Sequence, residues 1–224
     1  MGVMKNIVFA LLFCGAFLPN GLDAGWAITS DKVLKAISST QFQCIANGNY
    51  YEEFLGRPWK STGRPDTVGT TNMKNAMNAG VYRVVPIFVP CLLSSCATPE
   101  AQTDAFNNHL NNQGLSSQGP FIEVLGGTSR WGRNQTLNRQ RLAGFVKGLD
   151  RPGIFTNKAS WEAIMGSDFT DYTNYELWIV ELDKKPDFSN FVPFGGWQSP
   201  SMKQYGHGTV EGGCKFTADL IFTN

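Results

Sequence analysis

The sequence predicts an α/β protein, a modified (β/α) barrel whose second half is irregular and poor in helices. Short apolar segments alternate with amphipathic ones, which is the pattern of βαβ units around a mostly parallel sheet. The 24 glycines in 224 residues and the 12% of aromatic side chains favour a loop-rich fold over a helical bundle. Long helical patterns stop after residue 149, so the later part is expected to consist of strands and turns.

The first 24 residues are expected to be a signal peptide that is removed from the mature chain. Lys5 precedes an apolar or small stretch over 7–18, and Ala24 is a small residue suited to a cleavage site. That stretch is too short to cross a bilayer, and no later one reaches the ~20 apolar residues of a membrane helix. A buried N-terminal helix is the alternative interpretation. We therefore expect a secreted, extracellular protein without a membrane partner, with one domain over 25–224.

The first half of the chain is predicted to alternate strands with helices. Residues 26–30 are predicted as a strand and residues 31–37 as a short helix with its aliphatic side chains on one face. A second helix is predicted over 71–79, and Gly80 ends it. The next residues, 81–89, are dense in Val, Ile and Phe, which is typical of a strand buried on both faces.

The same alternation continues before the helices give way to strands. Residues 99–110 are predicted as a helix that begins at a proline, and 121–125 as a strand that a Gly-Gly pair ends. A helix with one apolar face is predicted over 136–149. In such a barrel, chemistry is expected where the strands end and the following loops begin. The remaining predicted strands are 153–156, 177–182 and 218–222.

Four cysteines follow the expected signal peptide, and an even number in a secreted chain favours two disulfides over a metal site. Three pairings are possible. Cys91 and Cys96 flank a Ser-Ser turn, so we favour a Cys91–Cys96 bridge together with Cys44–Cys214, which would join an early element to the last one. Asn134 begins an Asn-Gln-Thr sequon and is a predicted glycosylation site if it is exposed.

Charge and motif content argue against several classes of function. The 19 basic and 18 acidic residues give a net charge of +1, so no nucleic-acid partner is expected. The chain has no Gly-x-Ser-x-Gly elbow, Gly-rich phosphate loop or His-Glu-x-x-His motif, and we expect no cofactor and no metal. It has two histidines. His109 is expected to be solvated on its helix, and His207, between glycines near the last strands, is the more suggestive of the two.

Carboxylates near strand ends are the remaining candidates for chemistry. Glu123 lies within the apolar segment Phe-Ile-Glu-Val-Leu, where a charge is costly unless it has a partner or faces a polar site. It is either a site residue or half of a buried ion pair with an arginine such as Arg57 or Arg83. Asp219, in the last predicted strand, is an equally open case, because alternate residues of a barrel strand point inward.

Five short motifs occur in an order and spacing that point to one known family. They read Asn-Met-Lys-Asn-Ala, Pro-Cys, Gly-Ile-Phe-Thr-Asn, Phe-Gly-Gly-Trp and Pro-Ser-Met-Lys-Gln-Tyr, at residues 72–76, 90–91, 153–157, 194–197 and 200–205. Together they make residues 26–222 resemble the secreted, eukaryotic branch of the family 25 glycoside hydrolases. The resemblance implies a single lysozyme-like barrel domain, which we expect to be a monomer, directed at bacterial peptidoglycan in defence or digestion.

The resemblance also indicates where this chain departs from the family's active site. The family's Asp-x-Glu pair falls on Glu123 and Leu125, so a leucine occupies the position of the proton donor. Residues two apart in a strand face the same way, about 6.5 Å apart, which is how such a pair presents both carboxyls to one pocket. Two further acidic positions of the family fall on Thr29 and Val85, whereas Asp219 matches the family's acid in the last strand.

These departures favour a secreted lysozyme-like protein that binds cell-wall glycan and whose hydrolysis is impaired or absent. The alternative is an active muramidase that uses a rearranged carboxylate pair, Glu123 and Asp219. A barrel whose cleft binds a protein partner, or nothing, is a third possibility. Four aromatic side chains are candidates for stacking on sugar, unless they belong to the core: Trp59, Trp178, Trp197 and Tyr205.

Overall fold

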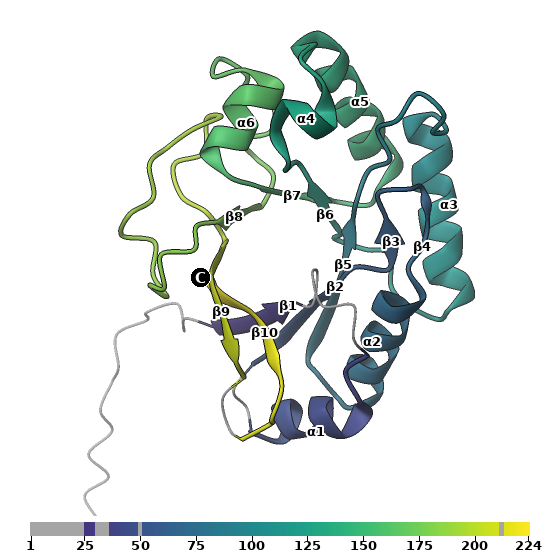
Figure 1. Ribbon diagram of the computed structural model, residues 1–224, viewed down its shortest axis with the longest axis vertical. Coiled ribbons are helices and arrows are strands. Elements are labelled where there is room, and N and C mark those ends of the chain that lie inside the picture. Colours follow the sequence, from purple (N-terminus) through teal and green to yellow (C-terminus); the bar gives the residue numbers. More distant parts are fainter. Residues whose placement is uncertain (1–24, 30–35, 49–50, 211–212) are drawn as a thin grey trace, which may run out of the picture.

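The computed structural model describes residues 25–29, 36–48, 51–210 and 213–224 (Figure 1). The expected signal peptide, 1–24, and most of the predicted helix 31–37 lie outside the described residues. Ala36 and Ile37 are described and are not helical, so the predicted helix is wrong at its C-terminal end.

Within these residues, eight strands close into a barrel in the order β1-β10-β9-β8-β7-β6-β5-β2. Neighbouring strands are parallel except β10, which is antiparallel to both β9 and β1. This arrangement confirms the predicted modified (β/α) barrel. The strands are β1 (Gly25–Thr29), β2 (Glu53–Gly56), β5 (Arg83–Phe88), β6 (Phe121–Glu123), β7 (Gly153–Thr156), β8 (Leu177–Val180), β9 (Met202–Thr209) and β10 (Thr217–Thr223).

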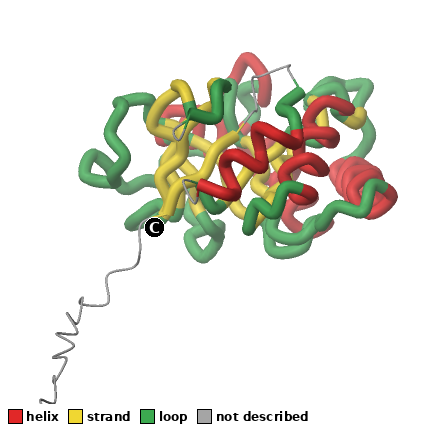
Figure 2. The backbone as a smooth tube through the Cα atoms, turned by 90° about the horizontal axis from the view of Figure 1, so that it is seen from below, coloured by secondary structure: helices red, strands yellow, loops and turns green. Residues whose placement is uncertain are grey.

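The helices pack on the outside of the barrel along its lower, right and upper sides in Figure 1, whereas loops cover the side of β8 and β9. Figure 2 shows the helices in red and the strands in yellow. Side-chain oxygens of Asp66, Thr98 and Asn157 accept first-turn N–H groups and so fix where three of the helices begin. Only strands and turns were expected after residue 149, and α6 (Lys158–Met165) is a helix in that part that the sequence did not predict. After β8 the described chain contains no helix. The helices are α1 (Ser39–Gly48), α2 (Thr67–Asn78), α3 (Pro99–Asn112), α4 (Gly127–Trp131), α5 (Gln135–Gly148) and α6 (Lys158–Met165), and a small hairpin of β3 (Trp59–Lys60) and β4 (Arg64–Pro65) precedes α2.

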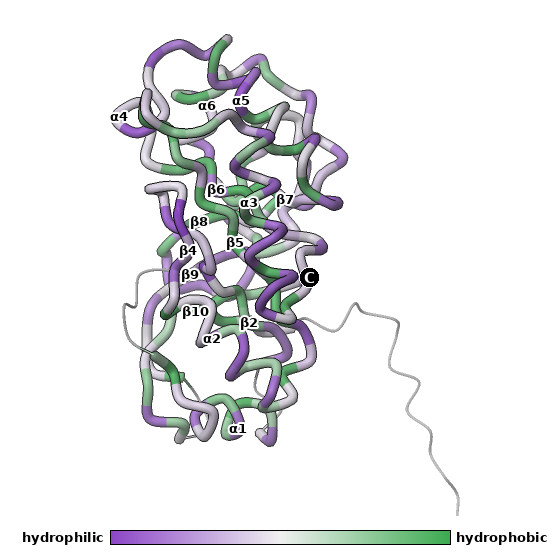
Figure 3. Tube along the Cα trace, turned by 90° about the vertical axis from the view of Figure 1, so that its right-hand side faces the viewer, coloured by the Kyte–Doolittle hydropathy of each residue, from purple (hydrophilic) through white to green (hydrophobic). Residues whose placement is uncertain are grey.

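The hydrophobic core has an inner and an outer part. The outer part lies between the strands and the helices. The inner part fills the barrel, because alternate residues of each strand point inward, and Trp178 stacks there on Phe155 with ring centroids 3.6 Å apart. Hydrophobic residues, green in Figure 3, gather along the strands accordingly. The inner cluster consists of Ala27, Leu55, Val85, Ile87, Val89, Phe121, Phe155, Trp178, Met202 and Ile221, with Leu125 and Val180 packed against it.

Two disulfides tie the chain together, and both favoured pairings are confirmed. Cys44–Cys214 joins α1 to the segment before β10, with the two Cα atoms 5.6 Å apart. Cys91–Cys96 closes a short loop between β5 and α3. No helix of the described chain is long and apolar enough to cross a membrane.

Candidate functional site

The candidate site lies at the end of the barrel where the seven parallel strands finish, which we call the mouth. In (β/α) barrels this end carries the chemistry, because the loops that follow the strands converge there. Thr29 is the last residue of β1, and it pairs in register with Asp219 of β10, which pairs in turn with His207 of β9. Because β10 runs antiparallel, its early residue Asp219 reaches the same end. We call Thr29, Asp219 and His207 the mouth row.

Asp219 holds His207 in place within the mouth row. The Asp219 carboxylate is 6% exposed, and its Oδ1 lies 2.8 Å from His207 Nδ1, which donates the hydrogen bond because a carboxylate can only accept. The His207 side chain is 54% exposed. Since Nδ1 is engaged with Asp219, the other ring nitrogen, Nε2, is the one left to meet a ligand.

Two buried oxygens of the mouth row have no hydrogen-bond partner within the described residues. They are Asp219 Oδ2 and Thr29 Oγ1. Thr29 is fully buried, and a buried polar atom is nearly always hydrogen-bonded in a folded protein. These two oxygens are therefore unsatisfied polar atoms at the mouth end of the barrel, and neither is exposed to solvent.

Glu123 lies at the end of β6 as half of an ion pair, and its partner is neither of the two arginines expected. Arg130 of α4 donates from Nη1 to Glu123 Oε1, and from Nη2 to the carbonyl oxygen of Pro90 at 3.2 Å. Arg57 and Arg83 pair with other carboxylates. The ion pair is mostly buried, with the Glu123 side chain 12% exposed and that of Arg130 24% exposed.

Glu123 and Asp219 lie on opposite walls of the barrel. In the closed strand order, three strands separate β6 from β10 in either direction. The two carboxyls are therefore not neighbours on one strand or on adjacent strands, unlike the two positions of an Asp-x-Glu pair. Each already has a partner of its own, Arg130 for Glu123 and His207 for Asp219.

The other predicted catalytic positions carry apolar side chains inside the barrel. Leu125, just beyond β6, packs against the inner cluster. Val85 is 2% exposed and belongs to that cluster, and it also lines a hollow at the end opposite the mouth. The structure therefore brings Thr29, Glu123, Leu125 and Asp219 to the mouth, but not Val85.

None of the four candidate aromatic residues presents a ring face at the mouth. Trp178 is fully buried inside the barrel, and Trp59 and Trp197 are each 3% exposed in the outer core. Tyr205 is half buried and packs edge-on against Trp26 at 6.1 Å, on the outside of β1. Burial or outward orientation thus argues against the expectation that these rings stack on a sugar in the mouth.

The comparisons with known proteins place the chain in a family. A family model described as "Lysozyme-like protein 1" matches residues 23–205. "Probable GH family 25 lysozyme 2" of Dictyostelium discoideum is 28% identical over 183 residues, covering 80% of this chain and 84% of that protein. The chain belongs to the family 25 lysozymes.

Further matches agree with this assignment. "Lysozyme-like protein 5" of Caenorhabditis elegans is 29% identical to this family 25 lysozyme over 226 residues, covering 98% of this chain and 99% of that protein. The solved structure of a family GH25 lysozyme from Aspergillus fumigatus superposes with a TM-score of 0.68 at 14% identity, covering 90% of this chain and 94% of that one. The superposition shows that this chain and the Aspergillus fumigatus lysozyme share a fold.

Three polar contacts in this family 25 lysozyme were not expected from the sequence. His109 is half buried rather than solvated, with Nε2 2.9 Å from Thr70 Oγ1, and burial lowers its pKa. Arg130 was not recognised as a partner of Glu123, because it lies seven residues away in a different element, α4, and the turn between β6 and α4 decides where it points. The pairing of His207 with Asp219 was also missed, although His207 itself stood out in the sequence.

Asn134 of the lysozyme is exposed, as a glycosylation site requires. It caps α5, where its Oδ1 accepts the Leu137 N–H at 3.0 Å. The cap uses the oxygen and not the amide nitrogen to which a glycan is attached. Asn134 therefore stays a predicted glycosylation site.

Proposed function

We propose that this secreted family 25 lysozyme binds bacterial cell-wall glycan at the barrel mouth and that its hydrolytic activity is impaired or absent. The proposal rests on the resemblance, which assigns the proton-donor position to the apolar Leu125, and is supported by the ion pair in which Arg130 donates to Oε1 of Glu123. Family membership supports peptidoglycan as the target, in defence or in digestion.

Without a proton donor, the leaving oxygen of the glycosidic bond is not protonated during hydrolysis. Glycoside hydrolases protonate the leaving oxygen with one carboxyl group and use a second carboxylate on the other side of the bond. A leucine has no proton to give. A carboxylate oxygen that accepts a guanidinium N–H is not itself an O–H donor, so Glu123 does not replace the missing acid. Removing a general acid costs about 10²–10⁴ in rate.

The mouth row keeps polar groups that suit a sugar. Asp219 Oδ2 and Thr29 Oγ1 have no partner in the described chain, and His207 offers Nε2 beside them. Sugar hydroxyl groups both donate and accept, so separate hydroxyl groups can pair with the carboxylate oxygen and with Nε2. These groups support binding without turnover. The two disulfides favour an oxidising compartment and therefore support secretion.

A pulldown and a clearing assay on the same protein test the proposal. We expect insoluble peptidoglycan to retain the wild-type protein, while the turbidity of a cell-wall suspension stays constant. The Asp219→Asn variant keeps the shape of the side chain but loses its charge, so we expect about tenfold weaker retention. Leu137→Gln, an exposed change on α5, is the matched control and should be retained like the wild type.

Two outcomes would contradict this proposal. If folded wild-type protein is not retained, the binding claim fails. If it clears the suspension and Glu123→Gln abolishes the clearing, the protein is an active muramidase with the rearranged Glu123 and Asp219 pair.

A further inference from the structure

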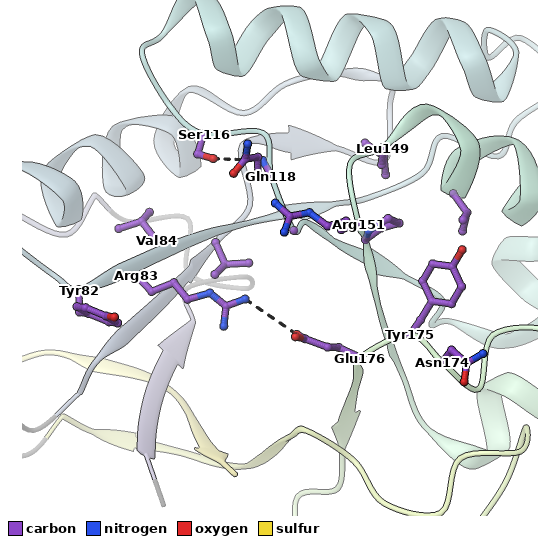
Figure 4. A pocket seen from close by; sticks show the side chains of 14 residues that line it. Tyr82, Arg83, Val84, Ser116, Gln118, Leu149, Arg151, Asn174, Tyr175 and Glu176 are labelled. Carbon is purple, nitrogen blue, oxygen red and sulfur yellow. Dashed lines mark hydrogen bonds and ion pairs between the residues drawn. The ribbon is translucent and has the colours of Figure 1, made fainter. Parts of the chain in front are cut away.

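A second hollow lies at the end of the barrel opposite the mouth, where the chain enters β5, β6, β7 and β8 (Figure 4). Its volume is about 790 Å³, within the range of small-molecule sites. By comparison, a hollow beside the ends of β7 and β8 measures about 140 Å³. Val85 of the inner cluster lines the large hollow, so the hollow reaches inward to the packed interior of the barrel.

Arg83 and Glu176 line one side of this hollow, and Arg83 is also paired with Glu53, which lies outside the lining. Arg83 Nη1 donates to both carboxylate oxygens of Glu53, at 3.1 and 3.3 Å, and Arg83 Nη2 lies 4.0 Å from Glu176 Oε2. Burial raises the pKa of Glu53, and Arg83 opposes that shift. Figure 4 shows Arg83 reaching across the hollow toward Glu176. The two hydrogen bonds to Glu53 hold the Arg83 guanidinium group in place before any ligand arrives, which lowers the entropy cost of binding.

Arg151 occupies the hollow from a strained backbone. Its φ is 50°, in the left-handed region that residues other than glycine rarely adopt. Its side chain is 76% exposed, and Nε lies 3.4 Å from the carboxylate of the adjacent Asp150. Strain of this kind persists where the rest of the structure enforces it, and it is concentrated at functional sites. Here the strained residue presents a guanidinium group to the hollow.

An aromatic ring and two amides complete the lining. Tyr82 is 88% exposed although it is a large aromatic residue, and it stands at one side of the hollow in Figure 4. The amide side chains of Gln118 and Asn174 are both exposed. A tyrosine ring offers an apolar face, and each amide both donates and accepts hydrogen bonds.

We propose that this hollow is a second binding site, for an uncharged saccharide. Arg83 pairs with Glu53 and lies near Glu176, and Arg151 lies beside Asp150, so each of these two arginines already has a carboxylate nearby and offers no unpaired charge to phosphate or another anion. The lining contains both donors and acceptors, which suits hydroxyl groups, and Tyr82 offers a face on which the C–H side of a sugar ring packs.

This site is independent of the mouth, so either proposal can fail while the other stands. The packed inner cluster fills the barrel between them. On a polymer such as a cell-wall glycan, two separate sites on one protein raise the overall affinity through avidity, provided that both can engage at the same time.

An NMR titration with the soluble tetramer of N-acetylglucosamine tests the second site. We expect the backbone amide signals of Gly119 and Asn174, which line the hollow, to shift with the tetramer concentration. Tyr82→Ala should weaken the binding that these signals report by about tenfold, whereas Tyr82→Phe keeps the ring and should bind like the wild type. The mouth variant Asp219→Asn should leave the same signals and their affinity unchanged.

Arg151→Gly separates binding from folding. Glycine adopts the left-handed conformation freely, so we expect this variant to be at least as stable to heat as the wild type. It loses the guanidinium group, and we expect about fivefold weaker tetramer binding. Shifts confined to mouth residues such as His207, an absence of shifts at Gly119 and Asn174, or wild-type affinity in both Tyr82→Ala and Arg151→Gly would overturn the proposal.

Discussion

Glu123 is the last residue of β6, and Leu125 lies two residues beyond it. The resemblance implies that family 25 lysozymes have an acid at each of these two positions. Leu125 packs on the inner cluster, and Glu123 turns to Arg130, which also holds the carbonyl oxygen of Pro90. Glu123 thus links β6 to α4, and Arg130 continues the link to the residues just after β5.

We expect Arg130→Ala to lower the free energy of unfolding by about 2 kcal/mol, because it leaves the mostly buried Glu123 carboxylate without its charged partner. Adding Glu123→Gln to that variant should recover part of the loss, since an uncharged amide is cheaper to bury. Urea unfolding of the two single variants and the double variant measures the coupling. Strictly additive losses would show that the two side chains do not stabilise one another.

At the scale of elements, one lysine anchors the long loop between β8 and β9. Lys203 of β9 is fully buried, and its Nζ donates to Asp183 Oδ2 at 2.8 Å and to the Asp187 carbonyl oxygen at 3.0 Å. Glu181 lies 3.6 Å from the same nitrogen. Although burial raises the pKa of Asp183, hydrogen bonds from Lys203, the Lys185 N–H and Asn190 lower it to about 2.

This pKa predicts how acid affects the loop. A carboxyl group whose pKa is lower in the folded than in the unfolded protein stabilises the fold above its ordinary pKa, and this contribution is lost as the pH falls through the folded value. We therefore expect stability to decline between about pH 4 and pH 2, and Asp183→Asn to decline less steeply. Thermal unfolding at several pH values measures both slopes, and equal slopes would contradict the assignment.

Elements whose apolar residues repeat with a clear period were predicted from the sequence, whereas elements without such a period were missed. The strand predicted at 81–89 and the helices at 99–110 and 136–149 correspond to β5, α3 and α5, because their apolar side chains repeat at one clear period. β9 was missed because glycines and polar residues predominate in it. Its buried Lys203 is stabilised by an ion pair with Asp183 in the preceding loop, which no local sequence pattern reveals.

The candidate site was predictable only in part. Glu123 and Asp219 were selected because each carries a charge in a predicted strand, where alternate residues point into the barrel. The partner of Asp219, His207, depends on a register shift between Leu220 and Ile221 that changes which residues of β9 and β10 face each other. A bulge of this kind follows from the packing of the closed barrel and not from residue types in either strand.

At the scale of the whole molecule, the closing strand and a disulfide hold the two ends of the described chain together. β10 pairs with β1 along its length, and Cys44–Cys214 crosslinks α1 to the segment before β10 across a sequence separation of 170 residues. Cys91–Cys96 spans a separation of only 5. A crosslink that closes a longer loop restricts the unfolded chain more.

We expect the Cys44→Ala, Cys214→Ala double variant to lose about 5 kcal/mol of stability and the Cys91→Ala, Cys96→Ala double variant about 2 kcal/mol, on the chain-entropy model. Denaturant unfolding of both variants against the wild type checks the order. A larger loss from the short loop would mean that native contacts around Cys91 outweigh restriction of the unfolded chain.

The apolar side chains that fill the barrel also insulate its two openings from each other. Trp178 and Phe155 stack across the interior, and among the described residues the inner cluster separates Asp219 at the mouth from Arg83 at the hollow. A substitution that changes what one opening recognises is therefore expected to leave the other opening undisturbed.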